Sequence, residues 1–479
     1  MEKIEIIKYI QGQMASTPER LQTFTHERSG KLFPKRHIYI KLQKYLADFG
    51  ERKKETPRAL VITGLRGVGK TTVMAQICAS TLKARLESDH ILFLSLEETV
   101  QVLGVGISEV LHAFEDVIGE SLERTQRNIY LFLDEVQKDP QWGSVLRSLY
   151  EKNKNIFICC TGSSAVELQT NADLARRFYF EKLPPLSFGE YQMITRGIYP
   201  IKGLKQLIGD ALYKTPNGKD AYSRLLECET TINQYWAKVD RTDIDAYLKV
   251  GTMPFALTMP KEDAVYDAIS LMLDKVTTKD LVEFGRFDQD TLLAMKRLLF
   301  LVAESDTMSS YQLERALGIK RLTVQNMLDA LEKTELIIRV PAYGSNMTVA
   351  KKPSKYLFMS PAIRMSFLRM TGNQATFQTR KGRLLEDLIG AHLYREFVSR
   401  GAGKIRHDAK QGGADFILQI ADRRQIAIEV GIGKKDDRQL LQTMKKIPCT
   451  YGITFSSSSL SWNEEKSILR VPLDYFFLA

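Results

Sequence analysis

The sequence predicts an α/β fold built on a parallel β-sheet. Between residues 59 and 183, five short apolar segments alternate with segments whose apolar spacing suits helices. This alternation is typical of a parallel sheet that helices cover on both faces. The first apolar segment leads into a glycine-rich loop, and the third ends in two carboxylates. The expected strands are Ala59–Thr63, His90–Leu96, Ile129–Asp134, Ile156–Thr161 and Phe178–Leu183.

The loop after the first strand is a complete phosphate-binding motif. Residues 64–72 read Gly-Leu-Arg-Gly-Val-Gly-Lys-Thr-Thr, which matches G-x-x-x-x-G-K-[ST], and the helix-compatible segment Val73–Arg85 follows. Glycines let the backbone N–H groups turn toward phosphates, and the start of a helix adds partial positive charge. The motif therefore predicts binding of a nucleoside triphosphate, through Gly64, Gly67, Gly69, Lys70, Thr71 and Thr72.

Four of the expected site residues have distinct chemical roles. Lys70 can reach the β- and γ-phosphates, and the hydroxyl of Thr71 can bind Mg²⁺. Asp134 and Glu135 follow a buried strand whose C-terminal end should face the ligand. We expect Asp134 to bind Mg²⁺, directly or through water, and Glu135 to act as the catalytic base that polarises the attacking water. The pattern predicts ATP hydrolysis.

The fourth strand also ends in polar residues. Thr161 or Ser163 could lie between the Asp134 strand and the phosphates and sense the γ-phosphate, or both could simply form a turn. The sequence leaves these two interpretations open. The segment Asn153–Ile156 lacks the aspartate of a guanine-binding N-K-x-D sequence, which favours ATP over GTP.

Composition restricts the class of protein. The 479 residues are 44% apolar, enough for about three domains with their own cores. The formal net charge of +11 favours an acidic partner such as nucleic acid, although many basic proteins only have solvated basic surfaces. Scattered cysteines and histidines support neither a disulfide framework nor a zinc site. Without a signal peptide or a membrane-length apolar segment, we expect a cytoplasmic protein that does not enter a membrane.

Residues 289–358 predict a small module of helices and a β-hairpin. Helices are expected at Leu292–Ala303, at Ser309–Leu317 and, after a turn at Gly318, at Lys320–Thr334. Two strands should follow, Glu335–Val340 and Tyr356–Met359, around a hairpin tip at Ala342–Pro353. Helix, helix, turn, helix and hairpin is the order of a winged-helix domain.

The third helix of this module would be the recognition helix, with Leu322 among its inward residues. Lys320 and Arg321 lie at its start, where side chains reach phosphates and base edges, and Lys351 and Lys352 lie on the wing. These four residues are the expected DNA contacts. A winged helix can also serve only for packing, and that alternative stays open.

Four motifs occur together in the first part of the chain. They are Gly64–Thr72, Leu133-Asp-Glu-Val-Gln-Lys138, Thr161-Gly-Ser-Ser164 and Leu183-Pro-Pro-Leu-Ser-Phe-Gly-Glu190. With them, the chain from about residue 36 onward resembles prokaryotic AAA+ ATPases close to the archaeal ATPase and STAND branches, whose C-terminal part ends in a nuclease-like fold. The resemblance implies that Arg176 or Arg177 senses the γ-phosphate or acts as an arginine finger, within one chain or between chains. A solvated Arg-Arg pair at a helix end is an equal alternative.

The last hundred or so residues resemble the PD-(D/E)xK nuclease core. Glu386 lies on an expected helix, and Asp415 and Glu429 lie on expected strands, where the family's acids bind Mg²⁺. The family's lysine is missing, because Gly431 stands two residues after Glu429; Lys434 or Lys435 could supply a charge from the next turn. We expect a degenerate nuclease fold used for binding or packing, rather than an active nuclease.

Three hypotheses for function follow from these patterns. The chain is an ATP-driven switch or motor on DNA, an ATP-gated DNA nuclease, or an ATP-regulated protein-interaction module. A protein partner or a homo-oligomer is compatible with each. The expected domains are an N-terminal helical segment (1–50), the P-loop AAA+ core (51–200), a helical lid or connector (201–285), the winged helix (286–375) and a restriction-endonuclease-like α/β domain (376–479).

Overall fold

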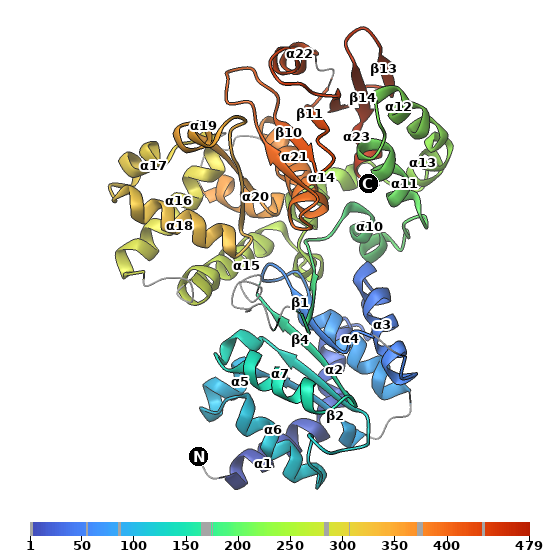
Figure 1. Cartoon of the computed structure of the whole chain (residues 1–479), viewed down its shortest axis with the longest axis vertical. Helices are drawn as coiled ribbons and strands as arrows, with labels where there is room; N and C mark the ends of the chain where they lie inside the picture. Colours follow the sequence, from blue (N-terminus) through green and yellow to red (C-terminus); the bar gives the residue numbers. More distant parts are fainter. Residues whose placement is uncertain are drawn as a thin grey trace. The chain divides into compact units, whose positions relative to one another are not determined.

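The computed structural model describes residues 3–53, 56–84, 88–163, 174, 176–281, 287–305, 307–370, 377–433 and 436–479. It divides into two compact units, Met1–Pro184 and Pro185–Ala479, and each is described here by itself (Figure 1).

The first unit is built on a five-stranded parallel sheet with the order β2-β3-β4-β1-β5. All five strands expected from the sequence are present, and no strand end is shifted by more than one residue. Strands β1 and β4 are buried along their whole length, which explains why their sequences are continuously apolar. The strands are β1 (Ala59–Thr63), β2 (Ile91–Ser95), β3 (Ile129–Asp134), β4 (Ile156–Gly162) and β5 (Tyr179–Lys182).

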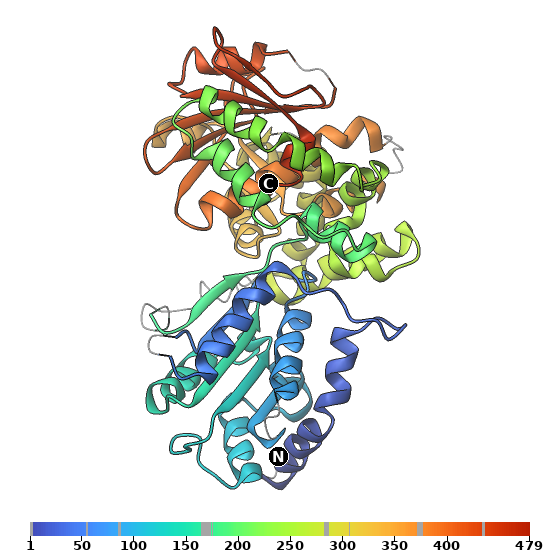
Figure 2. The ribbon, with the colours of Figure 1, turned by 90° about the vertical axis from the view of Figure 1, so that its right-hand side faces the viewer.

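Helices cover both faces of this sheet (Figure 2). On one face, the side chains of alternate strand residues such as Leu131 and Ile158 pack with Ile10 and Phe114 from helices. On the other face, the ring of Phe49 packs against Tyr130 and Phe157. The helices are α1 (Lys3–Ala15), α2 (Thr17–Thr25), α3 (His37–Gly50), α4 (Lys70–Lys83), α5 (Leu96–Glu98), α6 (Ile107–Ile118) and α7 (Trp142–Lys152).

The N-terminal segment is part of the first unit. In α1 the buried residues are Ile6 and Ile10, whereas Ile4 is 60% exposed. Ile6 and Ile10 belong to the core that also contains strand residues, so α1 packs on the sheet domain instead of preceding it as a separate segment.

The boundary between the units lies at Pro184–Pro185, earlier than residue 200, where the sequence analysis ends the ATPase core. The helix that follows explains the difference. Phe188, in α10 (Phe188–Arg196), packs against Trp236, Tyr247 and Phe477, all of which belong to the second unit. Aromatic packing therefore makes α10 part of the second unit, although α10 directly follows the first unit in the sequence.

The second unit begins with helices in the region expected to be a helical connector. Its first six α-helices precede residue 276, and the aromatic cluster around Phe188 includes Phe477, the residue after the C-terminal helix α23 (Leu473–Phe476). After α10 they are α11 (Leu204–Tyr213), α12 (Gly218–Glu227), α13 (Glu229–Trp236), α14 (Thr242–Ala246) and α15 (Glu262–Lys275).

The next elements contain the helices and the hairpin expected for residues 289–358, with two additions. The small strand β6 lies between the first two helices, and a short helix, α19, lies within the expected hairpin tip. The sheet is antiparallel with the order β6-β8-β7. The elements are α16 (Gln289–Glu304), β6 (Thr307–Met308), α17 (Ser310–Leu317), α18 (Arg321–Lys333), β7 (Ile337–Val340), α19 (Asn346–Lys351), β8 (Ser354–Phe358) and, after them, α20 (Pro361–Met370).

The inward position expected for Leu322 is wrong. Its side chain is 68% exposed, and the buried residues of α18 are Val324, Met327, Leu328, Ala330 and Leu331. These positions follow the i, i+3, i+4, i+7 spacing of a helix face, and Leu322 lies outside that stripe.

The C-terminal elements form a mixed six-stranded sheet with the order β13-β14-β12-β11-β10-β9. Strands β9, β10 and β11 are antiparallel neighbours, and β12 pairs parallel with both β11 and β14. The elements are α21 (Phe377–Leu393), β9 (Gly403–Arg406), β10 (Phe416–Ile420), β11 (Gln425–Val430), α22 (Arg438–Met444), β12 (Tyr451–Ser456), β13 (Ser461–Asn463) and β14 (Ile468–Pro472).

Among the described residues, no helix has the length and apolar character needed to span a membrane.

Candidate nucleotide site and acidic cluster

The phosphate loop joins the end of β1 to the start of α4. Gly64, Gly67 and Gly69 have φ angles of 149°, 85° and 90°, in the region that favours glycine. A Cβ at Gly64 would also clash with the backbone carbonyl of Leu183, so both the backbone conformation and the available space require glycine at this position. Lys70 is the first residue of α4; its Nζ donates to the carbonyls of Gly64 at 3.1 Å and Leu65 at 3.4 Å. Its ammonium thus lies inside the loop.

Three neighbouring strands bring the expected magnesium ligands together. The hydroxyl of Thr71, in the first turn of α4, donates to Asp134 at the end of β3, with Oγ1 3.0 Å from Oδ2 and 3.1 Å from Oδ1. Thr161, on β4, also donates to Asp134 and accepts the N–H of Glu135 at 3.1 Å. Because β4 lies between β1 and β3, its side chains connect the two halves of the site.

Glu135 has a left-handed backbone conformation and a carboxylate whose pKa is lowered. Its φ of 53° is left-handed, a conformation that non-glycine residues rarely adopt outside functional sites. Gln137 donates to its carboxylate. Burial alone would raise the pKa of Glu135, but the charge of Lys70 and the bond from Gln137 outweigh it, so the pKa is lowered. The carboxylate is therefore ionised, as a catalytic base must be.

Burial, together with the charge of Glu135, raises the pKa of Asp134 to about 6, in spite of the hydrogen bonds from Thr161 and Thr71. The nearby charge of Lys70 does not offset the effect of burial, and bound Mg²⁺ would add positive charge beside Asp134.

The residues at this site fit a nucleotide with Mg²⁺. Thr71 and Asp134 provide two oxygen ligands, the donors that Mg²⁺ prefers. Ser163 directly follows β4, and its buried Oγ has no hydrogen-bond partner among the residues that the structure describes, so it can bind a ligand oxygen. Thr72 lies in the first turn of α4 and is half-buried.

Arg36 stabilises the phosphate loop through hydrogen bonds, a role that was not predicted from the sequence. Arg36 is only 5% exposed, and its guanidinium donates to the carbonyls of Val68 and Pro184, each at 2.9 Å. The backbone before α3 is thereby fixed to the phosphate loop. An arginine outside any motif gave no signal of this role in the sequence.

Arg176 and Arg177 do not lie at the phosphate loop of their own chain. They precede β5, whose Tyr179 is paired with Leu60 near the start of β1, whereas the loop follows the end of β1. At about 3.3 Å per residue, the length of the strand separates them from the loop. Arg177 forms an ion pair with Glu151 at 2.6 Å, and Arg176 is exposed. A γ-phosphate contact within one chain is thus at odds with the sheet register.

Two of the three acids expected at the nuclease-like site, Glu386 and Asp415, contact a lysine that was not predicted from the sequence, and the third, Glu429, lies beside Asp415. Nζ of Lys355, on β8, lies 2.7 Å from Oε2 of Glu386 and 2.9 Å from Oδ1 of Asp415. Asp415 also accepts the N–H of Val430 at 3.0 Å and donates its own N–H to Glu429 at 3.3 Å. Lys434 and Lys435, proposed as the substitute cations, lie outside the described residues.

Lys355 was missed because the strand expected from the sequence begins at Tyr356. In the structure the strand begins at Ser354 and is buried at every position, and a lysine in a buried strand must have a charged partner. Burial opposes its charge, but Asp415 and Glu386 outweigh burial and raise its pKa.

The four residues expected to contact DNA are all exposed. Lys320 and Arg321 begin α18, and Nε of Arg321 donates to the hydroxyl of Ser310 at 2.9 Å. Lys351 ends α19, and Lys352 follows it. Each cation is available on the surface of its unit.

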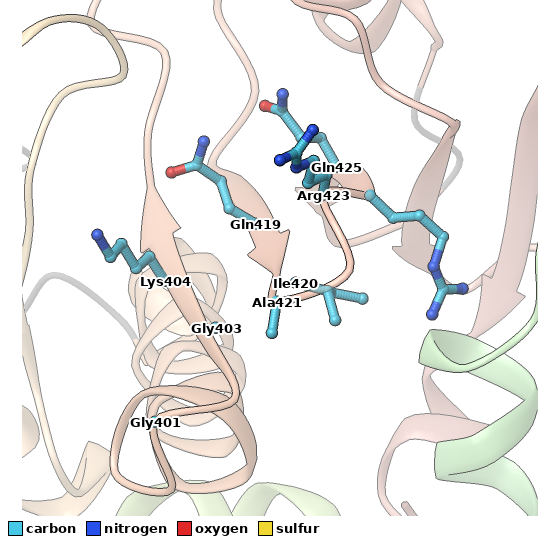
Figure 3. A pocket seen from close by; sticks show the side chains of 9 residues that line it. Gly401, Gly403, Lys404, Gln419, Ile420, Ala421, Arg423 and Gln425 are labelled. Atoms are coloured by element: carbon cyan, nitrogen blue, oxygen red, sulfur yellow. The ribbon is translucent and has the colours of Figure 1, made fainter.

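A pocket of about 510 Å³ lies at the other end of the strands that carry the acidic cluster (Figure 3). It is lined by the end of β10 and the start of β11, whereas Asp415 precedes β10 and Glu429 is near the end of β11. Lys404 and Arg423 give it basic character. The pocket is therefore separate from the acidic cluster.

Two family models match the chain. An AAA domain matches residues 56–192, and a domain of unknown function, DUF8612, matches residues 241–374. A curated relative, the uncharacterized protein MJ1637 of Methanocaldococcus jannaschii, is 31% identical over 479 residues, which cover 99% of this chain and 94% of that protein. An uncharacterized protein of Haemophilus influenzae is 24% identical over 389 residues, covering 79% and 84%.

Solved structures show weaker similarity. The Aeropyrum pernix ORC1 protein in complex with DNA aligns with a TM-score of 0.32 and 13% identity, over 69% of this chain and 91% of that one. The Thermotoga maritima RuvB Holliday junction branch migration motor aligns with a TM-score of 0.31 and 16% identity, over 67% and 94%. The identity and coverage shared with MJ1637 show that the chain belongs to the family of that protein, and it carries an AAA domain.

Proposed function

We propose that this protein is a Mg²⁺-dependent ATPase that works as a switch or motor on DNA. The observation that carries the ATPase proposal is the arrangement of Thr71, Asp134 and Glu135 at the end of the sheet, beside Lys70 in the phosphate loop. These residue types match the chemistry of phosphoryl transfer, in which positioning and charge stabilisation do most of the work.

Each residue has a defined task in this proposal. The loop N–H groups and the start of α4 bind the phosphates. Lys70 would exchange its bonds to the loop carbonyls for bonds to the β- and γ-phosphate oxygens. Thr71 and Asp134 would hold Mg²⁺, which would supply positive charge to the phosphates. Glu135 accepts a proton from the attacking water, and Thr161 connects Asp134 to the backbone of Glu135, where it can sense the γ-phosphate.

The DNA part of the proposal rests on the module of α16–α18 and β6–β8. Its order of helix, strand, helix, helix, strand, short helix and strand supports the proposal of a winged helix whose wing contains the additional helix α19. Lys320 and Arg321 would enter a groove with the start of α18, while Lys351 and Lys352 would contact phosphates from the wing. The net charge of +11 agrees with an acidic partner.

Two alternatives predict different results. In an ATP-gated nuclease, the C-terminal sheet would cleave DNA through Glu386, Asp415 and Glu429; the proximity of Asp415 to both other acids supports this candidate, whereas the ammonium of Lys355 between Glu386 and Asp415 opposes it. In an ATP-regulated protein-interaction module, the basic surface would be incidental. Arg176 or Arg177 would act on a neighbouring copy of the chain in a homo-oligomer, since the register of β5 is at odds with a contact within one chain. All five cysteines are free, which fits a reducing, cytoplasmic setting.

The test is ATP turnover by the full-length protein with no DNA, with double-stranded DNA and with single-stranded DNA. We expect Mg²⁺-dependent turnover that DNA changes, with the Lys70→Ala variant as the inactive control. Turnover that is insensitive to DNA, together with no salt-dependent DNA binding, would favour the protein-interaction module. No turnover at all would reject the ATPase proposal.

A further inference from the structure

A buried lysine lies between two carboxylates in the second unit. The side chain of Lys355 is 8% exposed, and those of Glu386 and Asp415 are 21% and 16% exposed. The two acids come from separate elements, α21 and the start of β10, and the lysine comes from β8. Three chain segments therefore meet at a single ammonium group.

The ammonium is strongly bound. Its distances of 2.7 Å and 2.9 Å to the carboxylate oxygens are those of charge-assisted hydrogen bonds. The ring of Phe416 lies 5.2 Å from Nζ and excludes water from one side. His407 faces the same ammonium, and burial together with that charge lowers its pKa to about 4, so it is neutral. In such surroundings, carboxylates remain ionised only beside a cation.

Neighbouring contacts fix the position of this lysine. Val340 of β7 pairs with Lys355 in the antiparallel register. Three residues further along β8, the N–H of Phe358 donates to Asp387 at 2.9 Å, and Asp387 also pairs with Arg364 at 2.6 Å. Because Asp387 follows Glu386 directly in α21, the same helix holds β8 and supplies one of the two acids. The ammonium cannot leave the acids unless β8 or its own side chain moves.

A divalent metal ion would need the oxygens that the lysine uses. Mg²⁺ and Mn²⁺ bind to carboxylate oxygens, and Glu386 and Asp415 present theirs to one point. Within the described ranges, no cluster of three or more His, Cys, Asp or Glu side chains has the arrangement of a metal site. The acids of this cluster are thus arranged around an ammonium group.

We propose that Lys355 is the resident cation of this cluster and that it keeps Glu386 and Asp415 from binding a divalent metal. Lysine replaces a metal ion here as the charge that holds α21, β8 and β10 together. The cluster is a latent metal site: removal of the ammonium takes away the charge that Lys355 supplies to Glu386 and Asp415, and a divalent ion can take its place, with Glu429 beside Asp415. This inference concerns the second unit and does not depend on the ATPase or on DNA binding.

The test measures Mn²⁺ binding, by the loss of the free-ion electron paramagnetic resonance signal, in the full chain without nucleotide. All proteins carry Asp134→Asn, so that the phosphate-loop site does not contribute. Lys355→Met removes the charge and keeps much of the side-chain length, whereas Lys355→Arg keeps the charge as the matched control. Thermal unfolding of each variant verifies that it is folded.

We expect Asp415→Asn to leave Mn²⁺ binding of the parent unchanged. Lys355→Met should gain one saturable Mn²⁺ site, Lys355→Arg should not, and adding Asp415→Asn to Lys355→Met should abolish the gain. If Lys355→Met does not fold, Lys355→Gln repeats the test, since its amide still donates to a carboxylate. The proposal is overturned if the parent binds Mn²⁺ through Asp415, or if the folded, uncharged variant gains no site. Mn²⁺-dependent cleavage of DNA by the parent that Asp415→Asn abolishes would overturn it as well and would favour the nuclease.

Discussion

The hydroxyl of Thr71 donates to the carboxylate of Asp134 across two strands of the sheet, with Oγ1 3.0 Å from Oδ2. These residues are 63 positions apart in the sequence. Each is a ligand type for Mg²⁺, and the metal would take the place of the bond between them. The bond therefore marks the position where nucleotide, metal and protein should meet.

The pH dependence of Mg²⁺ binding follows from Asp134. Burial and the charge of Glu135 raise its pKa to about 6, and Mg²⁺ must displace the proton. Affinity for Mg²⁺ATP should accordingly be constant above about pH 7 and fall as the pH drops through about 6. Calorimetric titration at several pH values measures this dependence. The Asp134→Asn variant, which has no carboxylate to titrate, is the control; an equal pH dependence in both proteins would contradict the assignment.

Lys70→Ala should abolish nucleotide binding or turnover, because the ammonium inside the loop is lost. The measurement is binding of a fluorescent ATP analogue together with phosphate release. Lys83→Ala, an exposed lysine in the last turn of the same helix, is the matched control and should behave as the parent. Unaltered hydrolysis by Lys70→Ala would exclude the loop as the ATP site.

Glu135→Gln should still bind ATP but hydrolyse it at least ~100-fold more slowly, the scale expected for loss of a general base. The amide keeps the size of the side chain and cannot accept the proton. Separate measurements of ATP affinity and single-turnover hydrolysis distinguish the two effects. Normal turnover by Glu135→Gln would show that Glu135 is not the catalytic base.

Changing Lys320, Arg321, Lys351 and Lys352 together to alanine should weaken DNA binding and lower its salt dependence. Each lost phosphate contact lowers the slope of log affinity against log salt by about 0.9. ATP turnover without DNA should not change, since none of the four lies in the phosphate loop.

The matched control removes the same charge from four exposed lysines elsewhere in the second unit: Lys202, Lys238, Lys410 and Lys445. This control variant should keep most of the affinity for DNA. If both quadruple variants bind DNA equally well, the module of α16–α18 and β6–β8 is not the DNA contact.

Removing one partner of the buried pair Arg364–Asp387 should destabilise the second unit strongly. Their side chains are 2% and 0% exposed, and Arg364 also donates to the carbonyls of Val302 and Ala303. Asp387→Ala takes the carboxylate away from a buried guanidinium, and breaking a buried ion pair in this way costs about 3 to 5 kcal/mol of unfolding free energy. Denaturant unfolding of the parent and the variant measures this loss of unfolding free energy. Asp436→Ala, which breaks an exposed pair with Arg438, should have no measurable effect.

Local patterns in the sequence determined much of the first unit. The glycine positions of the phosphate loop, the five strands of the sheet and the acids at the end of β3 each depend on a few consecutive residues, and all are found where the sequence predicts them. Backbone conformation and burial in a parallel sheet depend on neighbours in sequence, so a short motif is enough to specify them.

Contacts between distant segments could be decided only by the tertiary structure. The sheet order brings Thr161 to Asp134, and the packing of β8 on α21 brings Lys355 to Glu386 and Asp415, which are 31 and 60 residues away. The outward position of Leu322 depends on which side of α18 meets the core. Sequence spacing predicts which residues share a face of a helix or strand. Which element packs against that face, and which group pairs with each buried charge, depends on the packing of the whole chain.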